Sequence, residues 1–143
     1  MSTLYEDDVI AWSELQAALL RRGQWWQLDI DNIAEEIEDV GKSEKRELQS
    51  RQTVLLTHLL KWKYQPGRRS SSWVRTIREQ RTAVAEDLAR YPHLKPLLNN
   101  PQWLRQVYRR AKMDAEAQTH LQDLPDVLPW TVEQILEPDF FPE

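Results

Sequence analysis

The sequence predicts an all-α fold: a single-domain bundle of about five helices, with a long central helix and a short C-terminal helical strap, over residues 1–143. Three observations predict it. Only three glycines occur in the chain, which argues against a hairpin-rich β fold because tight hairpin turns depend on glycine. Apolar residues recur at steps of three and four along most of the sequence. Several capping patterns mark where helices begin.

The first two helices are predicted in an acidic part of the chain. The first spans residues 5–22, because Thr3 and Glu6 have capping-box spacing and Gly23 is a natural stop. The second begins near Asp29 or Asp31. Its expected buried face consists of Ile30, Ile33, Ile37 and Val40.

Gly41 leaves two alternatives for the second helix. It could end the helix, with Ser43 capping the next one, or it could be tolerated inside one long helix at a cost of about 1 kcal/mol. We expect a continuous but kinked helix. One direction of that helix would then carry Ile30, Ile37, Glu44, Arg51 and His58, at intervals of seven.

The later elements are punctuated by proline and glycine. A loop is predicted over residues 61–72, and the helix that follows is capped within residues 70–72 and ends by Tyr91. Asn100 and Pro101 start another helix, which ends near residue 120. Thr131 and Gln134 predict a short last helix. Phe140 and Phe141 are expected to pin the C-terminus into a groove.

Charge is strongly segregated along the chain. Residues 42–81 contain eleven Lys/Arg and three Glu, whereas residues 29–39 contain six acids and no base. One interpretation is that the two regions neutralise each other across helix contacts. The chain has no cysteine, no membrane-length apolar run and no signal-peptide pattern, so we expect a cytoplasmic protein without a membrane association.

The first candidate site is a polyanion-binding surface around the predicted loop. Phosphate binding requires clustered cations, and base stacking requires exposed aromatic rings. Both kinds of residue occur here: Lys61, Lys63, Arg68, Arg69, Arg75 and Arg78, with Trp62, Tyr64 and Trp73. The alternative is that the rings belong to the core and that the bases cover them with their aliphatic stems.

Two further candidates concern catalysis and metals. Arg51, followed by a polar residue and later by His58, resembles the motif of the HEPN helical ribonucleases, where His acts as acid or base and Arg stabilises the phosphorane. The alternative is a buried network of Glu44, Arg51 and His58.

A metal site is the second of these candidates. Possible carboxylate ligands occur at residues 35, 36, 38 and 39, and Glu116 and His120 are one turn apart, but no second matching pair lies on a core face. We therefore expect no metal and no other cofactor.

Four stretches resemble the bacterial family called domain of unknown function 29, which is common in cyanobacteria. They are NIAEEIEDVGKSEKRELQSR, LLTHLLKWKYQP, RSSSWVRTIREQR and LPWTVEQILEPDFFP, and they span residues 32–142. The resemblance implies an all-helical domain over the whole chain. It implies no activity and supplies no catalytic residue.

Taken together, the sequence favours a binding module over an enzyme. Its basic and aromatic surface would meet an anionic partner, either a nucleic acid or an acidic protein. The alternatives are a metal-independent ribonuclease that uses Arg51 and His58, and a structural partner protein that acts as a homodimer.

Overall fold

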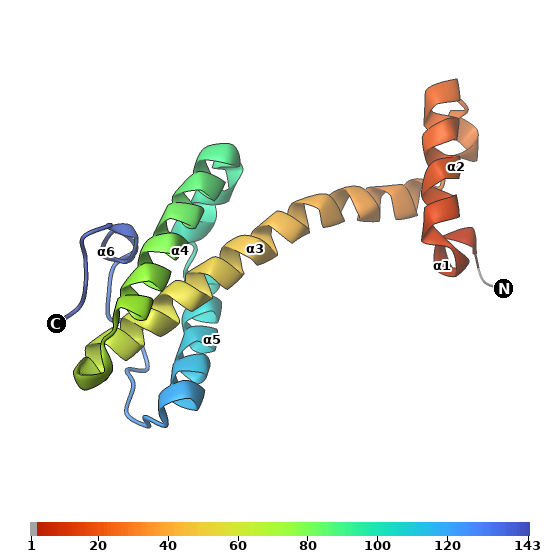
Figure 1. Cartoon of the computed structure of the whole chain (residues 1–143). Helices are drawn as coiled ribbons and strands as arrows, with labels where there is room; N and C mark the ends of the chain where they lie inside the picture. The colour runs from red at the N-terminus through yellow and green to blue at the C-terminus, as the bar shows by residue number, and fades with distance from the viewer. Residues whose placement is uncertain (1–2) are drawn as a thin grey trace. The chain divides into compact units, whose positions relative to one another are not determined.

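The structure is a computed structural model that describes residues 3–143 (Figure 1). Within this range there are six α-helices, three short 3-10 helices and no strand, which confirms the all-α prediction. The α-helices are α1 (Leu4–Asp7), α2 (Val9–Arg22), α3 (Ile30–Tyr64), α4 (Ser71–Arg90), α5 (Pro101–Thr119) and α6 (Val132–Leu136). The 3-10 helices are η1 (Trp25–Gln27), η2 (Pro66–Arg68) and η3 (Pro92–Asn99). The chain divides into two compact units, Met1–Glu44 and Lys45–Glu143, which are described separately below.

The acidic N-terminal segment forms two helices, so the prediction of one helix over residues 5–22 is wrong. Thr3 caps α1 by accepting a hydrogen bond from the Glu6 N–H. Asp8 leaves the helical conformation, at φ −153° and ψ 90°, and its carboxylate accepts from the Ala11 N–H to cap α2. An aspartate that can cap a second helix competes with continuation of the first. Gly23, at φ 71°, ends α2 as expected.

Polar contacts fix α2 to the start of α3 inside the first unit. The Trp12 indole N–H donates to Asp29 Oδ2 over 2.9 Å, and the Gln16 side chain accepts from the Asp29 backbone N–H over 2.9 Å. The Tyr5 hydroxyl donates to Glu36, and this hydrogen bond raises the pKa of Tyr5 to about 12. Trp12 is only 5% exposed. These contacts attach α1 to Glu36 of α3, and α2 to Asp29 just before α3 begins.

Helix α3 contains 35 residues and passes through Gly41 without interruption. The expectation of one continuous helix is therefore confirmed. Its predicted buried face is wrong for Ile30, Ile37 and Val40, which are 65%, 67% and 71% exposed. The hydrogen bonds that hold this end of α3 go from Tyr5 of α1 to Glu36 and from Trp12 of α2 to Asp29, and they leave these three apolar residues open to solvent. The fourth predicted residue, Ile33, is half-buried.

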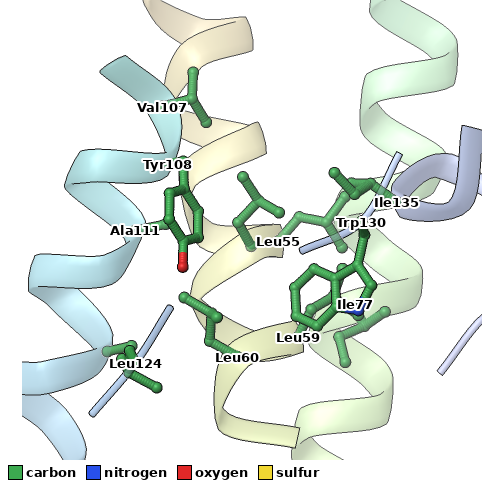
Figure 2. Packing of buried hydrophobic residues seen from close by; sticks show 12 residues of the cluster. Leu55, Leu59, Leu60, Ile77, Val107, Tyr108, Ala111, Leu124, Trp130 and Ile135 are labelled. Atoms are coloured by element: carbon green, nitrogen blue, oxygen red, sulfur yellow. The ribbon is translucent and has the colours of Figure 1, made fainter. Parts of the chain in front are cut away.

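The second unit contains the hydrophobic core. Within this unit, α4 and α5 lie along the C-terminal half of α3 (Figure 1). Figure 2 shows side chains from all three helices converging, together with residues from the C-terminal segment. The core residues include Leu55, Leu59, Leu60, Ile77, Val107, Tyr108, Ala111, Leu124, Trp130 and Ile135. Helix α3 continues to Tyr64, so the predicted loop over residues 61–72 begins later than expected.

The helix ends in the second unit follow the local sequence signals. The Ser70 hydroxyl accepts from the Trp73 N–H and caps α4, which ends at Arg90 before Pro92. Asn100 caps α5. Thr131 and Gln134 form the reciprocal capping box of α6. No helix in the described range is long and apolar enough to cross a bilayer.

Arg81 attaches the C-terminal segment to α4. It is 5% exposed, and its guanidinium donates to the backbone carbonyls of Ile135, Pro138 and Phe140 over 2.8, 3.2 and 2.7 Å. The two phenylalanines pack as expected: Phe140 lies edge-on to Trp130, and Phe141 lies 5.0 Å from Trp62 between ring centroids. Arg81 was not among the site residues predicted from the sequence, because its hydrogen-bond acceptors lie more than fifty residues further along the chain.

Candidate functional site

The predicted polyanion-binding residues separate into two groups, and the first group is committed to contacts inside the protein. Lys61 is 9% exposed, and its ammonium group donates to Gln118 Oε1 over 2.8 Å. The same ammonium group lies 4.9 Å from the centre of the Trp73 ring. Burial lowers the pKa of Lys61. This lysine therefore serves the packing of α3, α4 and α5.

Two more cations of the first group, Lys63 and Arg69, also cover aromatic rings. The Arg69 guanidinium lies 4.8 Å from the Trp62 ring centre, and it donates to the carbonyls of Trp62 and Pro142. Lys63 lies 5.6 Å from the Tyr64 ring centre. Trp62 and Tyr64 are half-buried against the core. One face of each ring is thus occupied by a cation of the same chain, which reduces the surface available for stacking on bases.

The second group consists of three exposed arginines: Arg68 in η2, and Arg75 and Arg78 in α4. Within residues 3–143, none of the three forms an ion pair. Arg75 and Arg78 are three residues apart and so lie on the same side of α4. They line a shallow hollow of about 440 Å³ with Ser71, Val74 and Glu79. The hollow lies at the positive end of a 20-residue helix, which also favours anions.

Arg51 and His58 do not form the predicted network with Glu44. Arg51 pairs with Glu47 one turn earlier, and its Nε lies 3.0 Å from Asp87 Oδ2, which joins α3 to α4. Burial lowers the pKa of Arg51, but Glu47 and Asp87 raise it by more, so the net shift is upward. The His58 ring lies 2.8 Å from the Val54 carbonyl through Nδ1. Burial lowers the pKa of His58, with a smaller opposing contribution from Val54.

This arrangement makes Arg51 a structural cation rather than a free one. It bridges two carboxylates, whereas stabilising a phosphorane would require an unpaired guanidinium. The step of seven residues from Arg51 to His58 corresponds to a rise of roughly 10 Å along the helix axis. Among the described residues, no group of three His, Cys, Asp or Glu side chains is arranged to hold a metal ion.

The fold and the surface define an all-α protein whose core is closed by a C-terminal strap and whose helix α4 presents unpaired arginines. The family model described as "Domain of unknown function DUF29" matches residues 4–141, and the chain belongs to this family. No curated protein and no solved structure matches the sequence.

Proposed function

We propose that this chain is a cytoplasmic, non-catalytic interaction module that binds an anionic partner through Arg68, Arg75 and Arg78. The observation that carries the proposal is that these three arginines are exposed and have no ion-pair partner within the described residues. Guanidinium groups bind carboxylates and phosphates in a bidentate manner, so three unpaired arginines in η2 and α4 are suited to an anionic surface.

An acidic protein is the favoured partner, and nucleic acid is the alternative. The aromatic rings that would stack on bases are half-buried and carry Lys61, Lys63 and Arg69 on their faces. Without exposed rings, the arginines offer only positive charge and hydrogen-bond donors, and carboxylate side chains can accept these hydrogen bonds as well as phosphates can. Three phosphate contacts on a single strand would give a slope of only about −2 in log affinity against log salt.

The proposal is tested with two probes, a fluorescent polyglutamate peptide and a fluorescent single-stranded RNA, by anisotropy across a salt series. We expect the peptide to bind, with an affinity that falls as salt rises. The double variant Arg75→Glu/Arg78→Glu should weaken binding at least about tenfold. The matched control is Lys45→Glu/Arg46→Glu, which makes the same change in charge at exposed positions of α3. Equal losses in both variants, or no binding of either probe, would refute the proposal.

A further inference from the structure

A groove in the second unit runs along one side of α5. It lies between this helix and the loop of residues 126–128, and its volume is about 510 Å³. Four side chains give it an apolar lining: Leu104 and Tyr108 from α5, and Val127 and Leu128 from the loop. None of these residues was predicted from the sequence as part of a site, because half of the wall comes from a loop that has no helical periodicity.

Two contacts hold the loop against α5, so the walls of the groove are in place before a ligand binds. The Tyr108 hydroxyl donates to the Pro125 carbonyl over 2.6 Å. The Lys112 ammonium lies 3.0 Å from Asp126 Oδ1. Lys112 is the last lining residue of α5, so this ion pair crosses from the helix to the loop at one end of the groove.

Two further cations border the groove along α5. Arg105 and Arg109 line it, lie one turn apart and are exposed. Neither has an ion-pair partner in the part of the chain that the structure describes. Lys112 and Asp126 pair with each other, so the lining keeps an excess of two positive charges, both on arginines. The groove therefore combines an apolar floor with an unsatisfied cationic edge.

The dimensions of the groove suit an extended hydrocarbon chain. The step from Leu104 to Lys112 corresponds to about 12 Å along the axis of α5. A volume of about 510 Å³ over this length gives a mean cross-section of about 43 Å², which is roughly 7 Å across. An α-helix with its side chains is about 10–12 Å in diameter, so a whole helix is too wide to lie inside.

We propose that this groove binds a small apolar carboxylate, of the class of medium-chain fatty acids. The hydrocarbon chain lies along Leu104, Tyr108 and Leu128, and the carboxylate binds Arg105 and Arg109. Guanidinium groups bind carboxylates in a bidentate manner, and they do so most strongly where no other anion competes. Sites for small ligands are typically apolar, with a few polar groups that fix the orientation of the ligand.

An extended peptide fits this groove less well than a fatty acid does. Backbone N–H and C=O groups need hydrogen-bond partners when they are buried. The polar side chains of the lining other than the two arginines already have partners: Tyr108 bonds to Pro125, and Lys112 pairs with Asp126. A hydrocarbon chain makes no such demand, and it needs polar contacts only at its carboxylate.

The test is isothermal titration calorimetry of the full chain with decanoate, kept below the concentration at which decanoate aggregates. We expect a dissociation constant below about 1 mM. Across hexanoate, octanoate and decanoate, each added methylene should tighten binding about two- to fourfold, because it buries more apolar surface. Decanol keeps the chain and lacks the charge, so it should bind at least about tenfold more weakly than decanoate.

Variants of the groove separate the contribution of the charge from that of the apolar floor. Arg105→Gln/Arg109→Gln, at two exposed positions, should weaken decanoate at least about tenfold and remove the preference for decanoate over decanol. Val127→Asn, at a position 77% exposed, should weaken both ligands by about twofold or more. Circular dichroism checks that each variant folds. The proposal is overturned if decanoate does not bind, if its affinity ignores chain length, or if the arginine variant binds it as the parent does.

A last comparison keeps this inference apart from the proposed function, on which it does not rest. Arg75→Gln/Arg78→Gln changes α4 and leaves the groove intact, so it should weaken the polyglutamate probe and keep the affinity for decanoate within about twofold. An equal loss of decanoate in this variant and in the groove variant would show attraction by overall charge, and the groove would not be the site. Displacement of decanoate by polyglutamate would show that the groove holds an acidic peptide instead, which would also overturn the proposal.

Discussion

Arg81→Met is the most informative single substitution in the second unit. Methionine keeps most of the apolar stem of arginine but removes the guanidinium. Three backbone carbonyls of residues 135–140 then lose their charged donor. The guanidinium also lies 5.5 Å from the Phe141 ring centre, so that contact is lost as well.

The magnitude follows from the contacts. A hydrogen bond from a charged group contributes about 1.5–3 kcal/mol, so three such bonds set a ceiling of about 5–9 kcal/mol. Part of this is offset by the cost of burying the cation, which also lowers the pKa of Arg81. We therefore expect the free energy of unfolding to fall by about 3–5 kcal/mol, a large share of the roughly 5–15 kcal/mol typical of a domain.

Urea denaturation measures the loss, and hydrogen exchange locates it. Amides of α6 should lose protection before those of the α3–α5 core. The control is Arg75→Met on the same helix, which is exposed and should change the free energy of unfolding by less than about 0.5 kcal/mol. If Arg81→Met costs less than about 1 kcal/mol, or if α6 keeps its protection, the three carbonyl contacts do not hold the strap.

Five further outcomes are expected. Gly41→Ala should raise the free energy of unfolding by about 0.5–1 kcal/mol in urea denaturation, because Gly41 is inside a helix and an added Cβ has open space around it. By contrast, Gly23→Ala should lower it by about 1–2 kcal/mol, because Gly23 has φ 71°. Trp12→Phe should cost about 1.5–3 kcal/mol through loss of the indole bond to Asp29, and NMR titration should show the pKa of Asp29 rise; an unchanged pKa would argue against that bond. Because burial lowers the pKa of His58 below its usual 6.5, the unfolded state binds more protons, so stability falls as pH drops through about 6.5. The plot of stability against pH should be flatter for His58→Gln than for the parent. If the parent cleaves RNA and His58→Ala does not, the ribonuclease alternative gains support over the interaction module; we expect no cleavage by either.

Helix starts were predictable because they depend on neighbouring residues alone. Ser70, Asn100 and Thr131 each cap a helix through a backbone N–H two or three residues away. The capping residue and the N–H group that it accepts from therefore lie within one helical turn of each other in the sequence. Asp8 is also a capping residue, but the apolar residues on both sides of it recur at helical spacing. That spacing led to the wrong prediction of one uninterrupted helix.

Burial was less predictable, because a periodic pattern reveals an apolar face but not what covers it. Ile30 and Ile37 have the same spacing as a core stripe, yet they are exposed, because Tyr5 of α1 bonds to Glu36 on another side of α3. Arg81 shows the converse. The sequence groups it with the other cations of residues 42–81, but only the fold brings the carbonyls of residues 135–140 to it.

The buried cation of α4 makes its hydrogen bonds to peptide carbonyls rather than to carboxylates, although Glu137 and Asp139 also act on it through their charge. Carbonyl oxygens do not take up protons in the ordinary pH range, and a guanidinium does not release one. Acid should therefore leave the three hydrogen bonds from Arg81 to residues 135–140 in place. The Arg51 contact between α3 and α4 relies instead on Glu47 and Asp87, whose carboxylates can be protonated. Acidification is thus expected to separate these helices at Arg51 before it frees the chain terminus.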